Sequence, residues 1–172
     1  MINYLKKCKT TQGGVKEFYL FQYEKYNRSE INDDKMALTK FPEGDVYKFE
    51  CNGTYNQQSS VEGGAFFFDQ TISIQLSEVY DVLDLDIYEF LCKRWRVILK
   101  TNNNQLLMFG VYNGMECKAS NASGGSKAEF NGFSLDFTGK ELKTALTISS
   151  LDDFNFIIKT QNILNAFLNF KI

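Results

Sequence analysis

The stretch that decides the fold is residues 66–76, which read FFFDQTISIQL. The even positions of this stretch are apolar except for Gln70, and the odd positions after Phe67 are polar. A repeat of two residues places alternate side chains on opposite faces of a β-strand. Residues 66–76 are therefore expected to form a strand with one face on a hydrophobic core.

The same alternation recurs in residues 47–55, 95–99 and 133–137, although Ile98 interrupts the polar face of its segment. Aromatic residues make up 15% of the chain, a content that favours strands. Asn-rich or Asn-Gly turns at residues 102–104 and 113–114 separate strand-like runs, and each predicts a hairpin. A chain of 172 residues of this kind is expected to form one mainly β domain.

One segment, residues 77–93, has the pattern of a helix. Ser77 is a suitable N-cap, acidic residues lie in the early turns, and Lys93 and Arg94 follow at the end. Its apolar stripe comprises Val79, Val82, Leu83, Ile87, Phe90 and Leu91. We expect this helix to connect two strands.

Three polar stretches are expected to be extended loops: residues 27–44, 55–64 and 119–128. The C-terminal segment, residues 160–172, is apolar and includes Phe167, Leu168 and Phe170. Packing on the chain's own core is the simpler interpretation of this segment. The alternative is that Phe167, Leu168 and Phe170 contact a neighbouring subunit.

Composition excludes several classes of function. The chain has no His, so catalytic triads with His, His-ligated zinc and a histidine pH switch are excluded. A net charge of −2 argues against non-specific binding of nucleic acid. The four cysteines form no C-x-x-C pair, and no secretion signal or membrane helix is visible. We therefore expect a soluble protein with reduced, buried thiols.

No motif in the chain predicts a catalytic site, a cofactor or a metal ion. Asp84 and Asp86 lie two apart on the expected helix and point in different directions, which is unsuitable for joint metal binding. The run Gly124-Gly125-Ser126-Lys127 has the wrong spacing for a phosphate-binding loop. The sequence thus predicts a protein that is not an enzyme and needs no cofactor.

Charge is distributed unevenly along the chain. Residues 49–92 contain eight acidic residues and no Lys or Arg, and Lys93, Arg94, Arg96 and Lys100 then follow closely. A solvated acidic surface explains this pattern most simply. Complementary surfaces on successive copies, or an acidic surface facing a passing polyanion, are the alternatives.

The order of these elements resembles that of tail-tube-like proteins of bacteriophages. Residues 131–141, NGFSLDFTGKE, are similar to a segment of virion proteins from phages that infect Bacteroidetes-type hosts. The resemblance covers residues 46–146. It implies a β-sandwich or barrel with one flanking helix, which assembles into stacked rings, commonly hexameric, that enclose a passage for DNA.

The resemblance also implies partners and contact residues. The partners would be copies of the chain and other tail or connector proteins, with DNA as non-specific cargo and no membrane. The location would be the virion tail, assembled in the host cytoplasm. The residues expected to contact the next ring lie in the segment 55–64 and are Tyr55, Asn56, Gln57, Gln58, Ser59 and Ser60.

The apolar C-terminus departs from the tail-tube pattern and favours, as alternatives, a head–tail connector, tail terminator or baseplate ring protein. From a different class of function, a β-sandwich module that binds carbohydrate or another ligand is the second hypothesis. An exposed aromatic platform on a monomer would favour that module, whereas rings would favour the virion protein.

Overall fold

The fold is seen in a computed structural model, which describes residues 13–24, 31–32, 37–38, 45–77, 91–123, 131–148, 151 and 157–159. The strands are β1 (Val15–Gln22), β2 (Ile31–Asn32), β3 (Ala37–Leu38), β4 (Asp45–Glu62), β5 (Ala65–Ser77), β6 (Arg94–Thr101), β7 (Leu106–Phe109), β8 (Met115–Ser123), β9 (Asn131–Glu141), β10 (Leu146–Ile148) and β11 (Ile157–Lys159). The prediction of a mainly β fold is confirmed.

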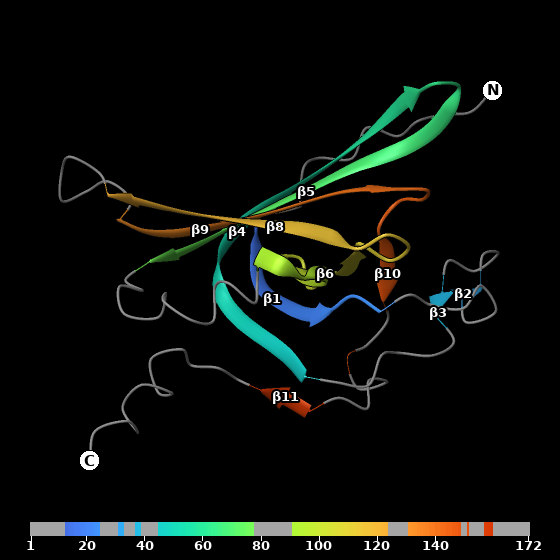
Figure 1. Ribbon diagram of the computed structural model, residues 1–172. Helices are drawn as coiled ribbons and strands as arrows, with labels where there is room; N and C mark the ends of the chain where they lie inside the picture. The colour runs from blue at the N-terminus through green and yellow to red at the C-terminus, as the bar shows by residue number, and fades with distance from the viewer. Residues whose placement is uncertain are drawn as a thin grey trace, which may run out of the picture.

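Six of these strands close an antiparallel barrel (Figure 1). The neighbours run in the order β1, β4, β5, β9, β8 and β6, and β6 then pairs with β1. Outside this ring, β7 pairs with β6, β10 pairs with β7, and β11 lies parallel to β4. Of the sandwich and the barrel that the sequence analysis allowed, the barrel is the architecture that forms.

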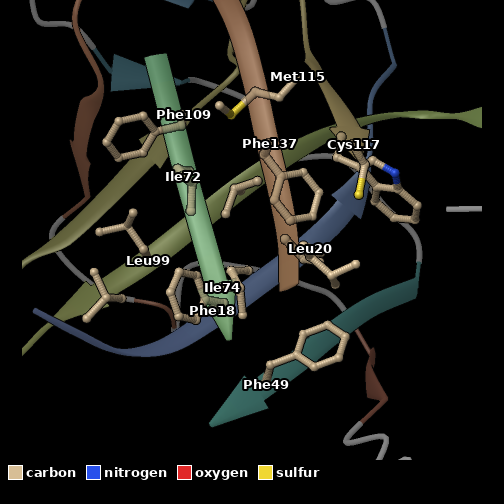
Figure 2. Close-up of a cluster of buried hydrophobic side chains, with 14 residues drawn as sticks. Phe18, Leu20, Phe49, Ile72, Ile74, Leu99, Phe109, Met115, Cys117 and Phe137 are labelled. Carbon is tan, nitrogen blue, oxygen red and sulfur yellow. The ribbon is translucent and has the colours of Figure 1, made fainter. Parts of the chain in front are cut away.

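The barrel interior is filled by one face of each wall strand (Figure 2). Phe18 and Leu20 come from β1, Ile72 and Ile74 from β5, and Phe137 from β9, and all five are fully buried. Ile72, Ile74 and Phe137 are among the alternate apolar positions of the sequence pattern, whereas Phe18 and Leu20 lie in a segment that the pattern did not include. Burial of large apolar side chains is the main force that holds such a barrel together.

A second hydrophobic cluster packs on the opposite face of β1, β6 and β7. Its buried members are Tyr19, Phe21, Val46, Ile98, Leu106, Met108, Val111 and Leu146. Ile98, which interrupts the polar face of its segment in the sequence, is fully buried there. β1 and β6 are therefore covered on both faces, and this explains the continuous apolar runs Phe18–Phe21 and Val97–Leu99 within them.

The expectation of a loop over residues 55–64 is wrong. β4 continues through this stretch to Glu62, and its pairing with β5 extends to the pair Glu62–Ala65. The turn consists of Gly63 and Gly64 alone, with φ angles of 57° and 82°. Two successive positive φ angles characterise the tight turns whose twist matches that of a hairpin, and glycine adopts them without steric cost.

The predicted helix over residues 77–93 is not seen. Ser77, the expected N-cap, is the last residue of β5 and pairs with Gly132. Leu91 and Cys92 are helical immediately before β6, and residues 78–90 lie outside the described residues.

Two of the other expected loops also contain strand residues. Residues 119–123 belong to β8, because pairing with β9 extends the strand beyond the point where its sequence becomes polar. The segment 27–44 includes the short strands β2 and β3, which pair with each other.

The two predicted hairpins have different outcomes. The turn at residues 102–104 joins β6 to β7, and the Thr101 N–H donates to the Gln105 carbonyl over 2.9 Å. The hairpin expected at Asn113-Gly114 does not form. β7 and β8 do not pair across it, because both pair with the same edge of β6 at successive positions.

Cys92 and Cys117 are both free thiols, as expected, but the expectation that the thiols are buried is wrong for Cys92. Cys92 is exposed, whereas Cys117 lies in the barrel interior (Figure 2). Burial, together with the nearby Asp136 carboxylate, raises the pKa of the Cys117 thiol to about 12. Cys117 thus acts as a small hydrophobic side chain.

Candidate functional site

The first candidate site is the arm, which we define as residues 54–67. β1 pairs with β4 only as far as Gly53, and β9 pairs with β5 only as far as Phe68. Beyond these points the β4–β5 hairpin projects from the barrel (Figure 1). Within the described ranges, no strand pairs with the outer edge of residues 54–62.

The arm contains all six residues that the resemblance assigned to ring-to-ring contacts, and the structure divides them into two groups. Tyr55 and Gln57 face their own barrel. The Tyr55 ring lies 5.5 Å from that of Phe109, and the Gln57 Oε1 accepts a hydrogen bond from the Ala145 N–H over 2.8 Å. The other four are Asn56, Gln58, Ser59 and Ser60; all but the half-buried Ser60 are exposed.

The arm also exposes apolar side chains. Val61 and Phe66 lie opposite each other near the turn and are 68% and 53% exposed. The Phe66 ring makes an edge contact with Phe68 at 5.0 Å between centroids. Because alternate residues share a face, Phe66 and Phe68 continue the face that carries Ile72 inside the barrel. The apolar face of β5 therefore extends from the barrel interior to the arm, where Phe68 is half-buried and Phe66 is exposed.

The three residues Phe167, Leu168 and Phe170, expected at a subunit contact, lie outside the described residues.

The second candidate site is built around the loop Gly110–Gly114, between β7 and β8. Gln70, Arg96 and Glu141 are buried polar residues that all bind this loop, and we call them the polar clamp. The Gly110 N–H donates to Gln70 Oε1 over 3.1 Å, and Arg96 donates twice to the Val111 carbonyl over 3.2 Å.

Glu141 completes the clamp. Its two carboxylate oxygens accept hydrogen bonds from the N–H groups of Tyr112 and Asn113 at 3.0 and 2.9 Å. Burial raises the pKa of Glu141, although the backbone N–H groups and the Arg96 cation oppose this change. The three clamp residues together bind the backbone of four successive loop residues, Gly110 to Asn113, and these buried hydrogen bonds fix the loop.

Tyr23 supports the same loop from the β1 side. Its hydroxyl donates to the Tyr112 carbonyl, and its ring lies 4.5 Å from the Arg96 guanidinium. Arg96 also donates to the Glu24 carbonyl. The Nε and Nη2 atoms of the buried cation therefore bind backbone oxygens, and the guanidinium lies against an aromatic face.

An open groove of about 530 Å³ lies on the outer surface beside the clamped loop. Cross-strand pairing aligns Thr71, Thr138, Glu116 and Arg94 in one row, and Asp69 lies opposite Lys140 in the adjacent row. Two of the charged residues that line the groove, Arg94 and Lys140, form ion pairs with carboxylates. Arg94 donates to Glu116 at 2.9 Å, and Lys140 donates to Glu62 of the arm at 2.6 Å.

The three clamp residues were not predicted from the sequence, although two of them are polar residues at positions where the strand pattern expects an apolar side chain. Gln70 is the polar residue among the apolar even positions of residues 66–76, and Glu141 follows the inward-facing Phe137 at the strand period. A polar residue in an inward position predicts a buried hydrogen-bonded group. Its partners come from distant segments, so this pattern does not reveal them.

The described residues contain no group of three or more side chains that could hold a metal ion. They also include no helix with the length and hydrophobicity of a transmembrane span. Comparison of the chain with protein-family models, curated proteins and solved structures found no match.

Proposed function

We propose that this chain is a structural protein that assembles with copies of itself through the arm. The observation that carries the proposal is the projecting hairpin, which has an unpaired edge and exposed Val61 and Phe66. By the resemblance of its sequence, we further propose a tail-tube-like ring subunit of a bacteriophage, whose rings stack around a passage for DNA.

The edge of the arm supports this proposal. Proteins that remain monomeric protect exposed edge strands with Lys, Pro, bulges or short length. Residues 54–61 contain none of these charged or Pro residues, and their pairing with β5 is regular throughout. An edge of this kind is suited to adding a strand from another chain.

The apolar side chains of the arm add a driving force. Full burial of a Val or Phe side chain stabilises an association by about 1.5–3 kcal/mol. Val61 and Phe66 retain more than half of their surface for such burial. A contact that covers both would supply part of the energy of a subunit interface.

The test is the oligomeric state of the full-length chain, measured by light scattering with negative-stain images of the same sample. We expect rings or tubes for the native chain and monomers for the double variant Val61→Lys, Phe66→Lys. Leu91→Lys is the matched control, because Leu91 is an exposed apolar residue outside the arm. A native chain that stays monomeric, or a double variant that assembles normally, would refute the proposal.

A further inference from the structure

We propose that the groove beside the loop Gly110–Gly114 binds a neutral oligosaccharide. This site is separate from the arm and does not depend on the assembly proposed above. Its volume of about 530 Å³ lies within the usual range of roughly 300–1,000 Å³ for small-ligand sites.

The lining of the groove sets the chemistry of the ligand. Two carboxylates, Asp69 and Glu116, are matched by two cations, Arg94 and Lys140. The lining therefore has no net charge and gives a polyanion or polycation no electrostatic advantage. Both cations are also engaged with carboxylates already, Arg94 with Glu116 and Lys140 with Glu62.

A polyhydroxylated ligand fits this lining better. Each sugar hydroxyl both donates and accepts a hydrogen bond, so it pairs equally well with carboxylates, a guanidinium and threonine hydroxyls. Thr71 and Thr138 lie side by side at one end of the row, Glu116 follows Thr138, and Asp69 and Lys140 lie in the adjacent row. Donors and acceptors therefore lie beside one another in the groove, and a ligand with several hydroxyls can pair with both kinds.

The floor of the groove is pre-formed. Asn113 is fixed by Glu141 below it, by Arg94, which donates to its carbonyl at 3.1 Å, and by its own side chain, which donates to the Lys140 carbonyl at 2.7 Å. Gln70, buried beneath the groove, binds Gly110. A floor held by buried hydrogen bonds loses little entropy when a ligand binds, which raises affinity.

Two glycines allow the loop Gly110–Gly114 to pack closely against Tyr23 and β9. A Cβ on Gly114 would lie 2.7 Å from the Tyr23 ring, and a Cβ on Gly139 would lie 3.1 Å from the Gly114 carbonyl oxygen. Both glycines line the groove. A glycine within a strand commonly marks a place where a ligand or another backbone approaches closely.

The experiment is a glycan array probed with the full-length chain, carrying neutral oligosaccharides together with sulfated and sialylated ones. Titration calorimetry with the best-retained neutral oligosaccharide then measures affinity. We expect the double variant Thr71→Val, Thr138→Val to lose at least about tenfold in affinity, because it keeps the shape of the groove and removes two hydroxyls. Thr147→Val is the matched control, since Thr147 is an exposed threonine of β10 outside the groove.

Three results would overturn the proposal: retention of no neutral glycan, retention of only anionic glycans, or equal affinity in the double variant. Light scattering of the same variants separates this proposal from assembly. If the variant Thr71→Val, Thr138→Val fails to assemble and the native chain binds no glycan, the groove is a contact between copies. If glycan binding survives while the native chain is monomeric, only the assembly proposal fails.

Discussion

β1 and the arm belong to the same sheet but have opposite surroundings. Residues 18–21 of β1 are buried in succession, because one hydrophobic cluster covers each face and a strand lies on each edge. The arm has a single strand neighbour along residues 54–62 and exposes Val61 and Phe66. Strand pairing alone therefore says little about local stability, which depends on how many faces and edges are covered.

The largest expected effect comes from a matched pair of Phe→Ala changes. Phe137 is fully buried inside the barrel (Figure 2), so Phe137→Ala should lower the free energy of unfolding by about 3–5 kcal/mol. Phe66→Ala on the arm should change it by less than about 0.5 kcal/mol. Urea unfolding of both variants is the measurement. Similar losses would mean that the arm is as well packed as the barrel wall.

A matched pair of Gly→Ala changes should give a smaller difference. Gly114 and Gly63 both have positive φ, 71° and 57°, so each variant carries a backbone cost of about 1–2 kcal/mol. At Gly114 the new Cβ would also lie 2.7 Å from the Tyr23 ring, whereas at Gly63 it meets nothing within 4 Å. We expect Gly114→Ala to cost a further 1–3 kcal/mol or so in thermal or urea unfolding. Equal costs would contradict the close packing of the loop.

The polar clamp should give the stability of the native chain a pH dependence that the variant Glu141→Gln lacks. Burial raises the pKa of Glu141 above its usual value of 4.5. At any pH between 4.5 and the raised pKa, the folded chain therefore binds more protons than the unfolded chain. The native stability should therefore fall, relative to Glu141→Gln, as pH rises through 4.5 to the raised pKa. Each unit by which folding raises the pKa corresponds to about 1.4 kcal/mol of the free energy of unfolding. Urea unfolding between pH 4 and 7 tests this, and parallel curves would argue against it.

The smallest expected effect concerns reactivity and leaves stability unchanged. Cys92 is exposed, whereas burial of Cys117 in the wall of the barrel raises its pKa to about 12. Iodoacetamide should modify Cys92 well before Cys117, because the thiolate is the reactive form. Peptide mass spectrometry locates the label. Comparable rates at both thiols in the native chain would show that the wall opens readily.

Much of the barrel could be predicted from the sequence. The alternation in residues 66–76 and 133–137 corresponds to β5 and β9, and Asn102–Asn104 marks the turn between β6 and β7. These predictions succeeded because each depends on neighbouring residues. The length of β4 was missed, because Gln57, Gln58, Ser59 and Ser60 resemble a loop until their pairing with β5 is known.

The candidate sites depend on distant contacts and were harder to predict. Asn113-Gly114 has the sequence of a hairpin turn, but β6 lies within reach of both flanking strands and pairs with each of them. Gln70, Arg96 and Glu141 come from three different strands and meet only when the barrel closes. The resemblance drew attention to the segment 55–64, although its strand structure was missed, whereas the clamp and the groove follow from the complete topology.

The pairing of β1 with β6 has a consequence for synthesis on the ribosome. Val15 pairs with Thr101, so β1 leaves the ribosome long before its second strand partner exists. At about 5–20 residues per second, the 86 residues between them (101 − 15) take roughly 4–17 seconds to add. During that interval Phe18 to Phe21 lack both β6 and the completed core. The aromatic side chains Phe18, Tyr19 and Phe21 therefore remain without their final contacts until β6 is made.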